Sequence, residues 1–273
     1  MILVPLDLQD KEMVKQWDDF CFYESGAWFW HTTDWMRYTL AYRLDRNPQN
    51  HSFMIIEDEQ IIGIVPLIIE HDRSAILDGI DFYEFSYGAG PVPFMLFSRY
   101  AKSNTIIKAY CMVVETIDEI ANNNRVQRGI FQHSALCTDT PFRLSYKNRT
   151  YDAVGSHTQL LTLDRPFPSL LRQMRKGHIS DVKRGMEMFN LWGVDSAVYG
   201  SALFEQYEHL HAKANGHVCR SSTTFKMQYD WMQAGNGLLF AAMKGGIPYG
   251  FVYIFLYKNK AYFGSACNAP EYR

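Results

Sequence analysis

The chain has 273 residues, of which 47% are hydrophobic, and its formal net charge is −2 at pH 7. This length and apolar content predict one large domain or two ordinary domains with a substantial hydrophobic core. A nearly neutral chain argues against a general nucleic-acid coat or a polybasic membrane protein, so any anion binding must be local.

Cysteine usage and the N-terminus indicate the compartment. The five cysteines are scattered and no CxxC pair occurs, which fits buried thiols in a reducing cytosol better than a disulfide framework. The first residues, MILVPLDLQDKEM, lack the basic start and the long apolar core of a signal peptide. The longest apolar stretch, at residues 61–69, is too short to cross a bilayer. We therefore expect a cytoplasmic protein with no transmembrane segment.

The N-terminal segment predicts helices and then a hairpin. Residues 1–45 are expected to be mainly helical. In HTTDWMRYTLAYR a threonine caps the helix, and Trp35, Tyr38 and Tyr42 then fall on one face. Residues 52–70 predict two apolar strands joined by a tight acidic turn.

The next segments predict further strands and one helix. Residues 74–94 predict a strand that runs into a Gly/Pro-rich loop, and residues 103–124 have helical periodicity. Short strands are predicted over residues 128–135 and 157–163.

A long basic amphipathic helix is predicted over residues 169–189, because apolar residues recur there at steps of three and four. Gly193 follows as a C-cap. Two more helices are predicted over residues 201–214 and 221–235. Residues 237–267 then predict three consecutive strands with tight turns.

Two hairpin segments are similar to each other. FMIIEDEQIIGIVPLII begins at Phe53 and FAAMKGGIPYGFVYIFL begins at Phe240. Gly63 and Gly250 occupy equivalent places, at an offset of 250 − 63 = 187 residues. Helices precede both hairpins, so we predict two related α/β units with a boundary near residues 148–157. Two unrelated hairpins are the alternative.

Six motifs follow one another along the chain: HTTDWMRYTL, FMIIEDEQIIGIVPL, SYGAGPV, TQLLTL, LLRQMRKGHISDVKRGMEMFNLWGV and LLFAAMKGGIPYGFVYIFLYKNKAYFGSA. In this order they resemble the FemAB/FemX-like, tandem branch of the GNAT acyltransferase superfamily. The resemblance implies an α/β (α+β) fold of two GNAT-like units, 1–152 and 153–273. Each would be a mixed, mostly antiparallel sheet flanked by helices, with the second incomplete at its C-terminus.

The resemblance also implies an N-acyltransferase. Such an enzyme moves an acyl or aminoacyl group from acyl-CoA or aminoacyl-tRNA to an amino group on a sugar, a peptidoglycan precursor or a polysaccharide intermediate. The acceptor is expected to be a small molecule or a lipid- or nucleotide-linked amino sugar. The usual acetyl-CoA loop, (Q/R)xxGx(G/A), is not found, which argues against an ordinary acetyl-CoA enzyme. The alternative is a non-catalytic GNAT-like domain that binds a phosphorylated ligand or RNA, or acts as a partner subunit.

Positive charge is concentrated in SLLRQMRKGHISDVKRG. Arginine offers bidentate contacts to phosphate and lysine a point charge, so this stretch predicts a surface that faces the phosphates of a substrate. Its members are Arg172, Arg175, Lys176, Lys183 and Arg184. The alternative is a solvated helix face whose charges pair with Asp181 or Glu187.

The loop SYGAGPVPF resembles the substrate-side loop of the family. In it Tyr87 precedes Gly88 and Gly90, which would permit close approach of the backbone to a ligand. An ordinary turn is the alternative. Glu84 and Asp81, just upstream, are candidate general bases, because a carboxylate among aromatic residues can have a raised pKa. A purely structural acid is the alternative.

Histidine residues supply the remaining candidates. The resemblance places His211 at the acceptor pocket, and His31 and Trp35 are expected to face the cleft between the units. His209 and His217 lie near Cys219, but their spacing matches no standard zinc module. We therefore predict no metal.

Overall fold

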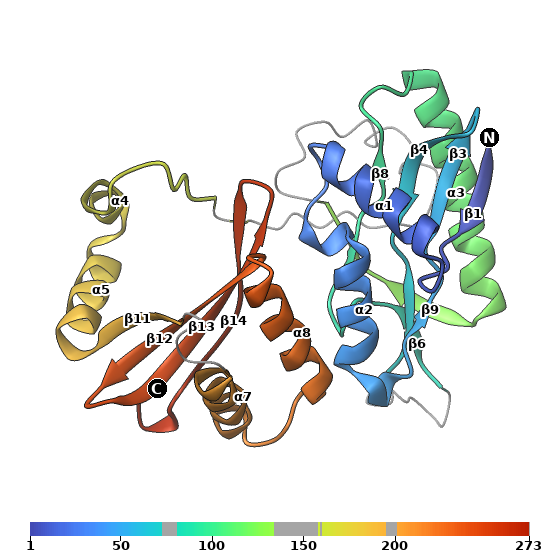
Figure 1. Cartoon of the computed structure of the whole chain (residues 1–273). Coiled ribbons are helices and arrows are strands. Elements are labelled where there is room, and N and C mark those ends of the chain that lie inside the picture. Colours follow the sequence, from blue (N-terminus) through green and yellow to red (C-terminus); the bar gives the residue numbers. More distant parts are fainter. Residues whose placement is uncertain (73–80, 134–157, 159, 195–200, 273) are drawn as a thin grey trace. The chain divides into compact units, whose positions relative to one another are not determined.

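The computed structural model of the chain describes residues 1–72, 81–133, 158, 160–194 and 201–272 (Figure 1). The fold is mixed α/β with mostly antiparallel sheets, and it divides into two compact units, as predicted. Unit 1 comprises Met1–Cys137, Val218–Asp230 and Leu256–Lys260, and unit 2 comprises Thr138–His217, Trp231–Phe255 and Ala261–Arg273. The predicted boundary between residues 152 and 153 lies outside the described residues.

Unit 1 contains two four-stranded sheets and one short pair of strands. The first sheet has the order β1 (Ile2–Pro5), β3 (Phe53–Glu57), β4 (Gln60–Val65), β8 (Leu96–Phe97). The second has the order β2 (Gln49–Asn50), β5 (Ile68–His71), β6 (Tyr83–Phe85), β9 (Val126–Gly129). The short pair is β7 (Val92–Pro93) with β10 (Phe131–Gln132). The helices of this unit are α1 (Lys11–Tyr23), α2 (Thr33–Tyr42) and α3 (Ser103–Asn123), with 3-10 turns at Phe29–His31 and Leu44–Arg46.

Polar side chains begin the first two helices. The carboxylate of Asp10 accepts hydrogen bonds from the N–H groups of Glu12 and Met13, which are among those left unpaired at the start of α1. Thr32 caps α2 by accepting from the N–H of Trp35. Of the two threonines proposed from the sequence, Thr32 is therefore the cap.

Two short segments from the second half of the chain belong to unit 1, and hydrogen bonds explain why. The Nζ of Lys258 donates to the carbonyl oxygens of Cys21 (2.6 Å) and Glu24 (2.8 Å), at the C-terminal end of α1. A positive charge is favourable there, because the helix dipole and the last carbonyls are negative. The hydroxyl of Ser221 donates to the carbonyl of Ala41 (2.6 Å), which fixes the second segment on α2.

Unit 2 is built on one antiparallel sheet. Its order is β11 (Asn190–Val194), β12 (Gly237–Lys244), β13 (Ile247–Tyr257), β14 (Lys260–Asn268). Its helices are α4 (Phe167–Gln173), α5 (Lys176–Met188) and α7 (Ala202–Asn215), and a 3-10 turn follows at Pro270–Tyr272. Helix α8 (Ser222–Gln233) begins in unit 1, and its last residues, from Trp231, belong to unit 2. Tyr207 of α7 lies against Phe251 and Tyr253, and Trp231 of α8 lies against Phe255, so these two helices cover one face of the sheet (Figure 1).

Three sequence predictions for this unit were wrong. Gly193 does not cap a helix, because α5 ends at Met188 with Phe189 as its C-cap and Gly193 lies in β11 opposite Phe240. The single helix over residues 169–189 is two helices, because the backbone is extended at Met174 and Arg175. A continuous helix would place the like charges of Arg172 and Lys176 four residues apart on one face. The strand predicted over residues 157–163 is not formed over the described residues 160–163, which pair with no strand of the described sheets.

The internal repeat is visible in the strand registers. In unit 1 Gly63 lies opposite Ile55, and the register shifts directly after Ile55. In unit 2 Gly250 lies opposite Ala242, and the register shifts directly after Ala242. The offset is the same for both pairs, since 242 − 55 = 187 and 250 − 63 = 187. Each hairpin is also preceded by an antiparallel strand and two helices, so the order of elements repeats as well as the sequence.

Candidate functional site

An aromatic surface lies along α2. The ring of Trp35 stacks on that of Tyr38, with centroids 4.8 Å apart and an interplanar angle of 19°. The ring of Tyr42 lies 5.7 Å from that of Tyr38, one turn further along the helix. The predicted spacing on one helix face is therefore confirmed. Tyr38 is buried, whereas Trp35 and Tyr42 are half-buried, so only these two rings can meet the flat or apolar face of a ligand.

Arg220 lies against this surface and was missed by the sequence analysis. Its side chain is buried, with 4% of its surface exposed. Its guanidinium donates to the hydroxyl of Tyr38 and to Oε1 of Gln228 (2.9 Å), and lies 3.7 Å from the ring centroid of Phe225. The arginine is 182 residues from Tyr38 in sequence, so no local pattern marks the contact.

The charge of Arg220 is felt by a second tyrosine of α2. Burial raises the pKa of Tyr42, and the nearby guanidinium of Arg220 opposes that rise. Because the net pKa lies above its ordinary value of 10.0, Tyr42 remains protonated at neutral pH and keeps a hydroxyl proton to donate.

The predicted substrate-side loop lies next to the same tyrosine. Gly88 has a φ of +62°, and a Cβ atom at this position would lie 3.1 Å from Cδ1 of Tyr42. Tyr87 and Gly90 exchange two backbone hydrogen bonds, of 2.9 and 3.1 Å, which close the turn. The structure therefore brings Trp35, the Gly88 turn and Arg220 into one region of unit 1.

A buried carboxylate occupies the inner side of this turn. The N–H of Gly88 donates to Oε1 of Glu70 (2.6 Å), and the N–H of Ala89 donates to Oε2 (3.0 Å). The side chain of Glu70 has no exposed surface. These two N–H groups thus bind an anion that the protein itself supplies, so we do not assign them to a substrate oxygen.

The candidate base Glu84 lies in an ion-pair network beside Glu70. Arg46 Nη1 is 2.7 Å from Oε1 of Glu84 and 3.5 Å from Oε2 of Glu70, and its Nη2 is 3.2 Å from Oδ2 of Asp72. The guanidinium of Arg128 binds the other oxygen of Glu84. Both oxygens of Glu84 are therefore engaged by arginines. A general base needs an oxygen within reach of the substrate proton, so we assign Glu84 to positioning β6 and the turn.

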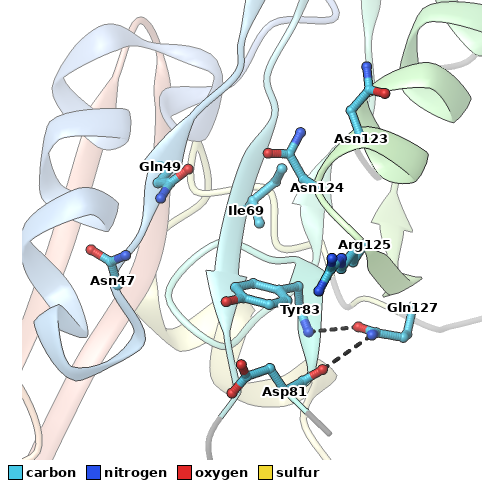
Figure 2. Close-up of a pocket in the computed structure, with 9 residues that line it drawn as sticks. All are labelled: Asn47, Gln49, Ile69, Asp81, Tyr83, Asn123, Asn124, Arg125 and Gln127. Atoms are coloured by element: carbon cyan, nitrogen blue, oxygen red, sulfur yellow. Dashed lines mark hydrogen bonds between the residues drawn. The ribbon is translucent and has the colours of Figure 1, made fainter.

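The second candidate base lies elsewhere. The side chain of Asp81 is 64% exposed, and its Oδ1 is 3.0 Å from Nε2 of His71. It lines a separate polar pocket (Figure 2), away from the Glu70 and Glu84 network.

His31 is buried and has a structural role in the described contacts. Its Nδ1 accepts from the N–H of Trp28 (3.0 Å), so its Nε2 carries the proton and donates to the carbonyl of Phe94 (3.2 Å). Burial lowers the pKa of His31 to about 4, which keeps the ring neutral. His211 belongs to unit 2, where its Nδ1 is 3.4 Å from Nδ2 of Asn215 and its ring lies edge-on to Tyr207.

The five predicted basic residues are all exposed; Arg172 lies in α4, Arg175 precedes α5, and the other three lie in α5. Neither helix has a buried residue. Arg184 pairs with Asp181 at 3.1 Å, as the alternative of a solvated face had proposed, and Arg172 donates to the hydroxyl of Ser169 (3.0 Å). None of the five lines the pocket of Figure 2. They form an open basic surface.

Two kinds of feature are absent from the described residues. No three His, Cys, Asp or Glu side chains gather in the described part of the chain in a way that could hold a metal ion. No described helix has both the length and the apolar character needed to cross a membrane.

Similarity to a solved structure identifies the fold of the chain. No family model and no curated protein matches the sequence. Among solved structures, FemX matches with a TM-score of 0.56 and 11% identity, over 100% of this chain and 82% of that chain. The chain therefore has a FemX-like fold. A tandem GNAT protein from the clavulanic acid biosynthesis pathway matches at a TM-score of 0.42 and 14% identity, over 100% of this chain and 80% of that chain. The FemX-like fold confirms the resemblance predicted from the six sequence motifs.

Proposed function

We propose that this protein is an N-acyltransferase that moves an acyl or aminoacyl group to the amine of a sugar, a peptidoglycan precursor or a polysaccharide intermediate. The observation that carries the proposal is the buried Arg220 beside the aromatic surface of α2 and the Gly88 turn, in a chain with a FemX-like fold. Aromatic rings suit the face of a sugar or a nucleobase, and a guanidinium adds positive charge beside them.

Acyl transfer of this kind needs little side-chain chemistry. The amine attacks the carbonyl carbon, and the site must hold both reactants, stabilise the developing oxyanion and accept one proton. We assign the holding of the acceptor to the half-buried ring of Trp35, which Tyr38 supports from behind. The protonated hydroxyl of Tyr42 would donate a hydrogen bond to the acceptor or to the oxyanion.

The exposed basic residues of α4 and α5 favour an extended polyanion as donor. A small phosphate is usually held in a concave pocket, whereas the phosphates of a nucleic acid are met by an open row of Lys and Arg. We therefore propose aminoacyl-tRNA rather than acyl-CoA as the donor, which also places the protein in the cytoplasm.

A second candidate function is binding of RNA or of a phosphorylated ligand without transfer. It is favoured by one observation, that both carboxylates suggested as bases already have partners. Glu84 is paired with Arg46 and Arg128, and Asp81 contacts the ring of His71.

The two functions are separated by one assay. The full chain is incubated with charged tRNAs, with acyl-CoAs and with amino-sugar nucleotides, and products are identified by mass spectrometry. We expect transfer from a charged tRNA, and loss of at least about tenfold in rate for Arg220→Lys, because a lysine cannot reproduce the guanidinium contacts to Tyr38 and Gln228. Lys226→Arg, on the exposed side of α8, is the matched control. A folded protein that retains tRNA but forms no product with any donor supports the binding function instead.

A further inference from the structure

The pocket of unit 1 that Asp81 lines has a volume of about 530 Å³, which is within the range of small-molecule sites. Figure 2 shows Asn47 and Gln49 on one side, the end of α3 on the other, and Ile69 and Tyr83 between them. Most of its polar lining consists of side-chain carboxamides. These are Asn47, Gln49, Asn123, Asn124 and Gln127.

The strand registers place this pocket on the opposite face of the sheet from the candidate functional site. Side chains of consecutive strand residues point to opposite faces, and residues directly opposite each other share a face. Ile69 lies opposite Gln49, and Tyr83 lies opposite His71. Glu70 lies opposite Glu84, and Glu70 holds the Gly88 turn on the other face. The pocket is therefore a separate site.

We propose that this pocket binds an uncharged pyranose unit of a glycan. A carboxamide both donates and accepts hydrogen bonds, as does each hydroxyl of a sugar, so a ring of carboxamides matches a polyhydroxyl ligand. The pocket contains one side chain of each charge, Arg125 and Asp81, so it has no net charge that would favour an ionic ligand. The ring of Tyr83 offers an amphipathic surface for the apolar face of a pyranose.

Two of these groups are already fixed in place. Gln127 accepts from the N–H of Tyr83 through Oε1 (2.7 Å) and donates to the carbonyl of Asp81 through Nε2 (3.2 Å), as Figure 2 shows. The ring of Tyr83 stacks on His71 with centroids 4.8 Å apart. A pre-organised lining loses less conformational entropy when a ligand binds, and this lower cost helps a site to bind a sugar through weak contacts.

Backbone strain at the rim is a second, independent observation. Arg125 directly follows the last turn of α3 and has a φ of +54°, in the left-handed region that glycine usually occupies after a helix. A non-glycine residue is strained in this region, and such strain gathers at binding sites. Asn47, another residue of the pocket lining, also has a positive φ, of +45°.

Saturation-transfer NMR with the full chain tests the proposal. The probes are maltose, cellobiose and N,N′-diacetylchitobiose, each at millimolar concentration. The test variant combines Gln49→Val with Asn123→Ala, which removes two carboxamides from opposite sides of the pocket. Its matched control is Asn122→Ala, since Asn122 is exposed on the same helix and does not line the pocket.

We expect saturation transfer to the ring protons of at least one disaccharide, and a loss of affinity of at least about tenfold in the double variant, from two missing hydrogen-bonding groups. The control should bind as the unchanged chain does. Absence of transfer to all three probes, or equal binding by the double variant, overturns the proposal. Neither result bears on acyl transfer, and Arg220→Lys should leave disaccharide binding unchanged.

Discussion

The buried imidazole of His31 should make the stability of the protein depend on pH. Its pKa is lowered from 6.5 to about 4, chiefly by burial, with the charge of Lys258 acting in the same direction against two opposing hydrogen bonds. Above pH 6.5 the ring is neutral in both the folded and the unfolded chain, so the contribution of His31 to stability is complete. Between the two values only the unfolded chain takes up the proton, and the free energy of unfolding falls as the pH falls. The difference of 6.5 − 4 = 2.5 units corresponds to a loss of about 3 kcal/mol between pH 7 and pH 4.

Urea denaturation at several pH values between 7 and 4 measures this effect when the unchanged chain is compared with His31→Gln. Glutamine can donate and accept hydrogen bonds but does not titrate, so the variant should be less stable at pH 7 and lose about 3 kcal/mol less on acidification. His209→Gln, at an exposed position of α7, is the control and should follow the unchanged chain. Parallel stability curves for the unchanged chain and His31→Gln would refute the assignment of a neutral, buried His31.

Three further outcomes are expected. Glu70→Gln should lower the free energy of unfolding, measured by urea denaturation, by about 3 kcal/mol. The reason is that one of the two N–H groups of the turn and Arg46 lose a buried, charged acceptor. A loss below about 1 kcal/mol would contradict the role of this carboxylate. Arg125→Gly should leave the free energy of unfolding unchanged or raise it by up to about 1 kcal/mol, as measured by thermal unfolding. Glycine relieves the backbone strain in the folded chain, but it also increases the entropy of the unfolded chain, and the two effects oppose each other. A clear loss of stability would mean that the arginine is a structural residue. Lys176→Ala combined with Lys183→Ala should reduce the slope of log K for tRNA binding against log salt concentration by about two units, as measured by filter binding. Lys108→Ala on α3 is the control and should leave this slope unchanged. An unchanged slope in the double variant would mean that the RNA binds another surface.

The parts of the fold that the sequence predicted are those fixed by local pattern. Each repeated hairpin has its apolar strands, polar turn and glycine within a span of 17 residues, and the registers of Gly63 and Gly250 confirm that the two spans are equivalent. The aromatic face of α2 follows in the same way from a spacing of three and four residues, which a helix must place on one side.

The parts that the sequence did not predict depend on contacts between distant segments. Arg220 follows Cys219, the last residue of a stretch in which only histidines and a cysteine were considered, and its partner Tyr38 lies 182 residues earlier. Glu84 seemed free to act as a base because nothing in its own strand shows that Arg46 and Arg128 meet both its oxygens. The break between α4 and α5 could not be predicted from the spacing of apolar residues either, because the same spacing of three and four continues through the break.

Side chains along β5 and β6 alternate between the two faces of the sheet. The face on which a residue lies therefore determines which site its substitution will affect. Ile69 and Tyr83 point to the pocket of Figure 2. Their direct neighbours in sequence, Glu70 and Glu84, point to the network that holds the Gly88 turn. A change at an even position of β5 or β6 should therefore act on the turn and on acyl transfer, and a change at Ile69 or Tyr83 should act on disaccharide binding. A pair such as Tyr83→Ala and Glu70→Gln, assayed for both properties, would separate the two sites if each variant lost only one of them.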